Sequence, residues 1–129
     1  MYKGTTVICD RYAFSGVAFS SAKGLDLEWC KDADRGIPEP DLVIYLKMPL
    51  TKSQERDDYG KERYENIQMQ TKVKRIYEQS LFDQRYWREV NADQTIPEVE
   101  EEIRSHTLEV LSDSKLKSEV LELWKIDNI

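Results

Sequence analysis

An aspartate and an arginine stand side by side at Asp10 and Arg11, directly after a short apolar run. Arginine offers a planar fork of N–H donors that matches phosphate oxygens, and aspartate binds a hard cation such as Mg²⁺ or its water ligands. The pair therefore suits a site for a phosphate group and a metal ion. An exposed ion pair at a strand end is the simpler alternative, and these two residues on their own do not decide between the two interpretations.

The elements that would position this pair can be predicted from the neighbouring pattern. Residues 5–9 are rich in β-branched side chains and predict a buried strand. Ligands of open α/β sheets bind beyond the carboxyl ends of the strands, which is where the pair would lie. Ser15 has the position of an N-cap for a short helix over residues 16–22, Gly24 suits its end, and residues 25–33 predict a second short helix.

The clearest strand in the sequence covers residues 41–48, where a near-continuous apolar run predicts a central parallel strand covered on both faces. It follows a loop at residues 36–40 that contains two prolines. Residues 56–65 are almost wholly charged and cannot pack a core. This run is either a solvated segment or a mobile lid that carries arginines toward a phosphate.

Apolar residues at three- and four-residue steps predict a long helix over residues 62–86. Its apolar stripe consists of Met69, Val73, Ile76, Tyr77 and Leu81. A weak strand follows at residues 88–92. Thr95 then has the position of an N-cap, with proline in the first turn and glutamate three residues on, for a helix that runs to about Leu111. His106 in this helix is expected to be structural.

Residues 50–55 predict the start of a further helix after the clearest strand. The predicted order is therefore β-α-α-β-α-α-β-α, with a last helical turn at residues 119–124, and this order indicates an α/β domain with a parallel sheet. The 129 residues fit one domain, and a net charge of -6 argues against nucleic-acid binding through bulk charge. Cys9 and Cys30 are expected to be free thiols, although their positions leave a disulfide open. The sequence shows neither a signal-peptide pattern nor an apolar run of membrane-spanning length, so a cytoplasmic protein without membrane contact is expected.

Residues 10–19 read DRYAFSGVAF, which resembles the signature of the thymidylate kinases. Further matches are GIPEPD at residues 36–41, ERYEN at residues 62–66, Gln70, and Asn91 with Ala92. The resemblance implies a P-loop NTPase-like, three-layer α/β fold with a parallel sheet, of the nucleoside monophosphate kinase type. It also implies transfer of the γ-phosphoryl group of ATP to dTMP with Mg²⁺, and a homodimer.

The resemblance assigns roles to the residues that match. The catalytic group consists of Asp10, Arg11, Arg63 and Glu65, of which Asp10 and Glu65 would reach Mg²⁺ through water. The dTMP site would contain Arg11, Ser15, Gly16, Phe19, Tyr64 and Gln70. On the ATP side, Arg56 would pack on the adenine ring from the lid, next to a turn formed by Asn91, Ala92 and Asp93. Val17, Ala18 and Phe19 would face either the dTMP pocket or the dimer interface.

One departure from the family pattern is the lack of a Gly-x-x-x-x-Gly-Lys-Ser/Thr motif in these residues. That loop would hold the β- and γ-phosphates of ATP. We therefore expect residues 1–129 to be a partial, N-terminally incomplete thymidylate kinase domain, with a lid at about 51–65 and a tail at 112–129, which is inactive alone. A non-catalytic nucleotide-binding or dimerising remnant of the fold, or a kinase for another monophosphate, are the alternatives.

Overall fold

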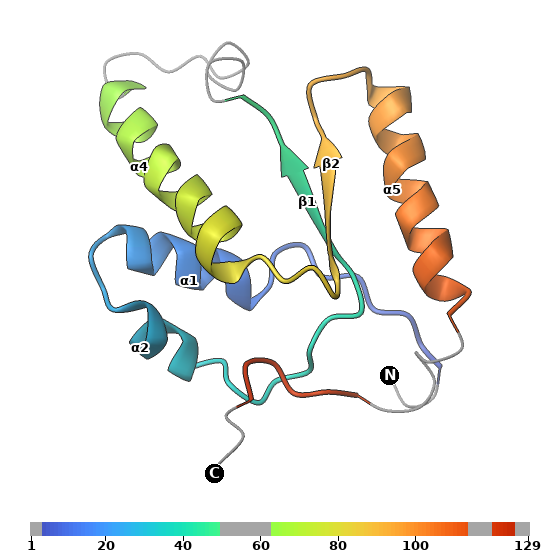
Figure 1. The fold of residues 1–129 in the computed structure, drawn as a ribbon, viewed down its shortest axis with the longest axis horizontal. Helices are drawn as coiled ribbons and strands as arrows, with labels where there is room; N and C mark the ends of the chain where they lie inside the picture. Colours follow the sequence, from blue (N-terminus) through green and yellow to red (C-terminus); the bar gives the residue numbers. More distant parts are fainter. Residues whose placement is uncertain (1–3, 50–62, 114–119, 126–129) are drawn as a thin grey trace.

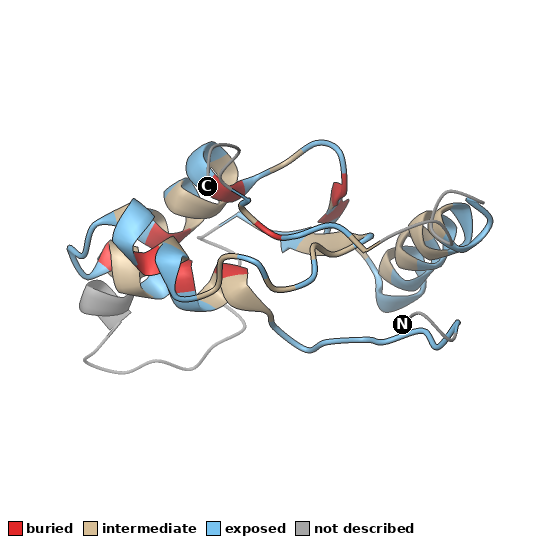
Figure 2. Cartoon of the chain, turned by 90° about the horizontal axis from the view of Figure 1, so that it is seen from below, coloured by how far each residue is buried: buried red, intermediate tan, exposed pale blue. Residues whose placement is uncertain are grey.

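A computed structural model describes residues 4–49, 63–113 and 120–125, and of residues 63–66 it describes the backbone alone. The elements in chain order are α1 (Ala13–Ala22), α2 (Leu27–Asp32), β1 (Val43–Lys47), α4 (Arg63–Ile76), the π-helix η1 (Tyr77–Leu81), β2 (Trp87–Asn91) and α5 (Ile96–Leu111). β1 and β2 pair in parallel, with Val43 opposite Trp87 and Lys47 opposite Asn91. Figures 1 and 2 show α1, α2 and α4 on one side of this pair and α5 on the other. The predicted α/β class with a parallel sheet is confirmed.

The strand predicted at residues 5–9 is wrong, because this segment forms no regular structure and is exposed throughout. The side chains of Val7 and Ile8 are 59% and 91% exposed. β-branched composition favours a strand only where the backbone finds hydrogen-bond partners on a neighbouring strand. The described part of the chain offers residues 5–9 no such neighbour.

Helix α1 begins three residues earlier than predicted, and its N-cap is Tyr12 rather than Ser15. Ser15 lies inside the first turn, where its hydroxyl donates to the carbonyl oxygen of Tyr12 at 3.3 Å. The predicted end is confirmed, since the helix stops at Ala22 and Gly24 has a φ of +107°. Only glycine adopts such a φ at little cost, which explains its place just after the helix.

Strand β1 is shorter and less buried than predicted. It lies in a two-stranded sheet with β2 as its only described neighbour, and Leu46 is 53% exposed. The apolar run correctly predicted a parallel strand, but coverage of its two faces depends on elements that the run itself does not specify. The loop before it is confirmed as irregular, apart from an antiparallel bridge between Pro38 and Glu122. That bridge replaces the helical turn predicted at residues 119–124, which is therefore wrong.

The long helix is interrupted: the α-helical part ends at Ile76, and one π-helical turn continues to Leu81. The predicted apolar stripe is nevertheless correct, because Val73 and Leu81 are 6% and 4% exposed and the other stripe residues pack against the same core. In α5 the predicted cap is confirmed, since Thr95 Oγ1 accepts a hydrogen bond from the backbone N–H of Glu98 at 3.3 Å.

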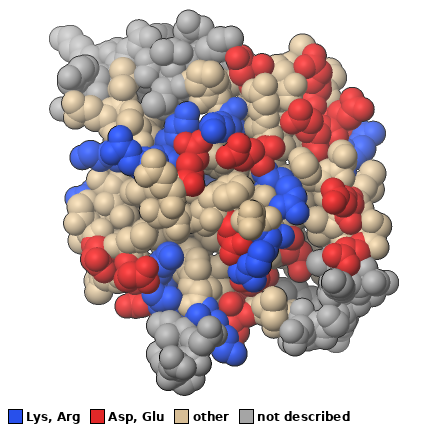
Figure 3. Space-filling model, in the orientation of Figure 1, with Lys and Arg blue, Asp and Glu red and all other residues tan. Residues whose placement is uncertain are grey.

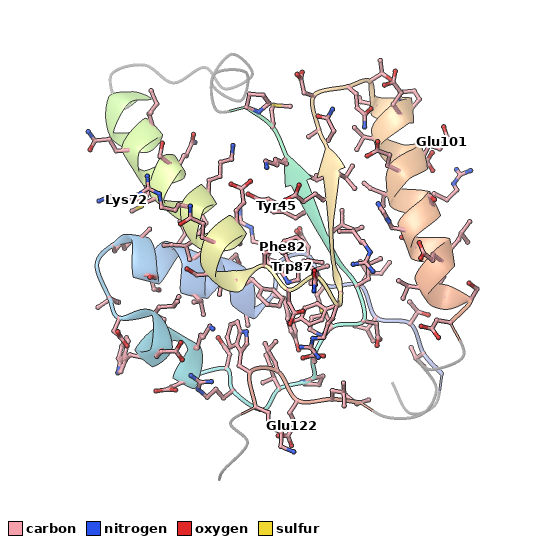
Figure 4. All side chains as sticks on the ribbon, in the orientation of Figure 1. Tyr45, Lys72, Phe82, Trp87, Glu101 and Glu122 are labelled. Carbon is pink, nitrogen blue, oxygen red and sulfur yellow. The ribbon has the colours of Figure 1, made fainter. Side chains whose placement is uncertain are left out.

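The core joins α1 to the sheet through aromatic rings. Phe14, Val17, Ala18 and Trp87 are each at most 4% exposed. Val17 and Ala18 therefore pack inside the protein, and the prediction that they face a pocket or a dimer interface is wrong. Figure 4 shows Tyr45, Phe82 and Trp87 gathered between the strands and the lower end of α4.

Two further expectations concern the cysteines and the membrane. Cys9 is exposed, Cys30 is buried, and both are free thiols, as predicted. Within the described ranges, none of the helices combines the length and the hydrophobicity that crossing a membrane requires.

Candidate functional site

The backbone of Arg11 is the least ordinary feature near the predicted phosphate site. Its φ is +69°, in the left-handed region that residues other than glycine rarely adopt. Such a conformation costs about 1–3 kcal/mol, and residues that adopt it cluster at functional sites. Arg11 and its neighbour Asp10 are both exposed, so the turn presents a guanidinium and a carboxylate to solvent just before α1.

The π-helix η1 lies next to this turn. Burial raises the pKa of Tyr77, and the positive charge of Arg11 opposes the rise, which places the guanidinium within electrostatic reach of η1. π-helical turns inside longer helices recur at functional sites. The sequence predicted neither the left-handed turn before α1 nor the π-helix that α1 contacts.

An ion pair that the sequence did not predict lies at the carboxyl end of β1. The ammonium of Lys47 is 2.8 Å from a carboxylate oxygen of Glu78 and 3.9 Å from one of Glu89. The close contact with Glu78 raises the pKa of Lys47. The only sequence signal was a lysine at the end of the clearest strand, where ligands of α/β sheets bind.

Three residues predicted to line the dTMP pocket share α1. Ser15 is half-buried, Gly16 is exposed, and Phe19 is 42% exposed. A Cβ added at Gly16 would meet no heavy atom within 4 Å, so this position is open. The structure thus leaves these side chains available on α1, while Phe14, Val17 and Ala18 fill the core.

Gln70 contributes an amide from α4, the helix that packs against α1. Its Oε1 atom is buried and has no hydrogen-bond partner among the described residues. A buried acceptor without a partner costs about 1–3 kcal/mol, which a ligand N–H could recover. The packing of α1 on α4 therefore brings the helix with Ser15 and Phe19 beside the helix with this unsatisfied acceptor.

The turn after β2 is held by one bond to the backbone of β1 and one to the side chain of Asn91. The N–H of Ala92 donates to the carbonyl oxygen of Lys47 at 2.8 Å, and Asn91 Oδ1 accepts from the N–H of Asp93 at 2.8 Å. The turn predicted on the ATP side therefore lies at the carboxyl ends of both strands. Figure 1 shows this turn beyond the tips of the two strand arrows. Helix α1 lies toward the other end of the strands, where it passes the C-terminal end of α4.

The remaining predicted site residues belong to the predicted lid and to the start of α4. Arg56 and most of the predicted lid lie outside the described residues. Arg63, Tyr64 and Glu65 lie in the first turn of α4, but their side chains are outside the description. Their predicted roles remain predictions.

Among the described residues, no three His, Cys, Asp or Glu side chains lie close enough together to hold a metal ion. Mg²⁺ in phosphoryl-transfer sites keeps several waters and takes few protein ligands besides the substrate phosphates. A single exposed carboxylate at Asp10 fits such a contact through water. Figure 3 shows basic and acidic side chains interspersed over one face of the molecule, so anion binding there depends on individual arginines and lysines.

Comparison with known proteins agrees with the resemblance seen in the sequence. A family model described as thymidylate kinase matches residues 1–103. The chain is 46% identical over 102 residues to thymidylate kinase of Dictyostelium discoideum, covering 79% of this chain and 46% of that protein. It is 45% identical over 121 residues to thymidylate kinase of Arabidopsis thaliana, covering 94% of this chain and 45% of that protein.

Similarity extends to the human protein and to a solved structure. The chain is 41% identical over 129 residues to thymidylate kinase of Homo sapiens, covering 95% of this chain and 58% of that protein. Its fold is similar to that of thymidylate kinase from Candida albicans, with a TM-score of 0.63 at 26% sequence identity, covering 88% of this chain and 59% of that one. The chain thus spans about half the length of the relatives that it matches.

Proposed function

The chain belongs to the thymidylate kinase family, and on that premise we propose that it supplies the dTMP-binding part of an enzyme that transfers the γ-phosphoryl group of ATP to dTMP. The observation that carries this proposal is the left-handed backbone of Arg11, which presents an exposed guanidinium beside Asp10 at the start of α1. A strained residue at this point of the DRYAFSG stretch supports a role in binding.

The proposed mechanism relies on position and charge. Phosphoryl transfer needs charge neutralisation and alignment more than covalent help from the protein. Arg11 would bind the dTMP phosphate, the ring of Phe19 would lie against the base with Ser15 and Gly16 nearby, and the unsatisfied Oε1 of Gln70 would accept a base N–H. Tyr64 would complete this pocket from the first turn of α4.

The proposed ATP side combines the turn after β2 with the predicted lid. The hydrogen-bonded turn of Asn91, Ala92 and Asp93 would border the adenine ring. Arg56 and Arg63 would reach the nucleotide from a lid at about residues 51–65. Mg²⁺, when bound with the phosphates, supplies neutralisation of their charge, and Asp10 and Glu65 would hold its water ligands.

We further propose that residues 1–129 act as part of one kinase domain with a C-terminal tail at 112–129, and that the protein forms a homodimer as the family resemblance implies. The sequence contains no Gly-x-x-x-x-Gly-Lys-Ser/Thr motif. We therefore expect these 129 residues to bind dTMP but to lack turnover on their own.

Two measurements on the purified chain test the proposal. Thermal shift with dTMP and with ATP separately should show stabilisation by dTMP and little by ATP. Formation of ADP from ATP, Mg²⁺ and dTMP should remain at the rate seen without dTMP. Stabilisation by neither nucleotide would favour a dimerising remnant of the fold over a nucleotide-binding one, and turnover at rates typical of kinases would show that the chain needs no further phosphate loop.

A further inference from the structure

The last described segment of the chain, residues 120–125, runs antiparallel along the loop before β1, and we call it the C-terminal strap. The N–H of Leu123 donates to the carbonyl oxygen of Ile37 at 2.7 Å, and the N–H of Gly36 donates back to Leu123 at 3.0 Å. The N–H of Glu39 donates to Leu121 at 2.7 Å. The strap lies beyond residues 1–103, which the family model matches. Figure 4 places Glu122 of the strap away from the sheet, on the far side of the loop.

Two contacts besides these backbone hydrogen bonds anchor the strap. The side chain of Leu123 is 0% exposed in the core. Arg35 Nη1 donates to the carbonyl oxygen of Trp124 at 2.8 Å. The other nitrogens of Arg35 are held by Glu28 and Asp32, each at 2.6 Å. This arginine therefore joins α2, the loop and the strap.

The loop and the strap in turn hold the residues that follow Arg11. The hydroxyl of Tyr12 donates to the carbonyl oxygen of Pro38 at 2.7 Å. Pro38 in turn forms an antiparallel bridge with Glu122 of the strap. The ring of Phe14 meets the ring of Trp124 edge to face, with centroids 5.6 Å apart. One contact from the loop and one from the strap thus reach the first turn after Arg11.

We propose that the C-terminal strap positions Arg11: it braces Phe14 directly and Tyr12 through the loop, so that the turn before them stays left-handed. A residue other than glycine keeps such a backbone only where its surroundings impose it. Tyr12, Arg35 and Trp124 are then positioning residues, which act through Arg11 and touch no substrate. The consequence for dTMP binding rests on the proposed function, whereas the effect on the backbone of Arg11 does not.

Three variants of the full chain test this inference. Tyr12→Phe removes the hydroxyl that bonds Pro38 and changes little else. Arg35→Gln releases the strap at its distal end without touching α1. Arg104→Gln is the matched control, because Arg104 forms an exposed ion pair with Glu100 on α5, at 2.6 Å, and loses the same charge.

The first measurement is NMR of Arg11, where a positive φ gives a strong nuclear Overhauser effect between its amide and α protons. The second is titration calorimetry with dTMP and with thymidine, which lacks the phosphate, alongside urea unfolding of each variant. We expect Tyr12→Phe and Arg35→Gln to weaken the nuclear Overhauser effect between the amide and α protons of Arg11. Both variants should also lower the affinity for dTMP by about tenfold and leave the affinity for thymidine unchanged. Arg104→Gln should match the parent chain in both measurements.

An unchanged Arg11 signal in Tyr12→Phe would overturn the inference, and this conservative variant decides the matter if Arg35→Gln fails to fold. Equal losses of dTMP and thymidine affinity would also overturn it, since they would indicate a general structural role. If the parent chain binds dTMP no better than thymidine, the proposed function fails, and the Arg11 signal alone then decides whether the strap positions this residue.

Discussion

The ring of Phe14 meets the ring of Trp87 edge to face, with centroids 5.0 Å apart. This contact ties the first turn of α1 to the first residue of β2. The two rings are 4% and 2% exposed, so the position of α1, and with it that of Arg11, depends on this packing. Edge-to-face pairs contribute about 0.5–1.5 kcal/mol beyond the area that they bury.

Phe14→Ala should therefore lower the free energy of unfolding by about 3–5 kcal/mol, because it opens a cavity against Trp87 and Trp124. Urea unfolding followed by tryptophan fluorescence measures the loss. Phe19→Ala is the matched comparison on the same helix, since Phe19 is 42% exposed. It should cost far less stability while weakening dTMP binding, and similar losses of stability in both variants would contradict the account of α1.

Arg11→Gly and Arg11→Ala should differ in stability although both lose the guanidinium. Glycine adopts a φ of +69° without strain, whereas alanine does not. We expect the glycine variant to be more stable by about 1 kcal/mol in urea unfolding. Equal midpoints for the two variants would mean that the left-handed turn stores no strain.

Thr95→Ala should lower the free energy of unfolding by about 1 kcal/mol, because it removes the acceptor for the backbone N–H of Glu98 at the start of α5. Thr107→Ala is the control in the same helix. Its hydroxyl donates back to the carbonyl oxygen of Ile103 in mid-helix, a bond that adds little to helix stability. During thermal unfolding, the helical circular dichroism signal should therefore be lost at a lower temperature in Thr95→Ala than in the parent chain, and at the parent temperature in Thr107→Ala.

The chain should lose stability at alkaline pH. Burial, aided by the charge of Glu78, raises the pKa of Tyr45 to about 12. The folded protein therefore keeps a proton that the unfolded chain releases near pH 10, and stability falls as the pH rises from about 10 toward 12. Tyr45→Phe should flatten this decline in urea unfolding at a series of pH values. An equally steep decline in the variant would show that Tyr45 does not contribute.

Local signals in the sequence predicted the local parts of this structure. The cap at Thr95 involves a residue three positions on, and the buried stripe of Val73 and Leu81 repeats with the helix period, so neighbouring residues suffice to predict both. Residues 5–9 show the limit of this approach. A strand depends on a partner elsewhere in the chain, and composition alone does not supply one.

The candidate site was predictable mainly through its resemblance to a family. Residue types and resemblance singled out Arg11, and resemblance singled out Gln70, but neither specifies the left-handed backbone of the first or the unsatisfied buried oxygen of the second. The ion pair of Lys47 and Glu78 likewise joins β1 to η1 across the fold. The strap was predicted as a helical turn, because its antiparallel pairing with residues 36–39 has no signature in the sequence.

The central claim is that Arg11 binds the phosphate of dTMP, and the most direct test is the ratio of dTMP to thymidine affinity in the parent chain and in Arg11→Gly. Titration calorimetry measures both ligands on both proteins. We expect the parent chain to prefer dTMP by about 10- to 100-fold, as charge-assisted hydrogen bonds to a phosphate predict, and the variant to bind the two ligands equally. A preference for dTMP that survives in Arg11→Gly would contradict the claim.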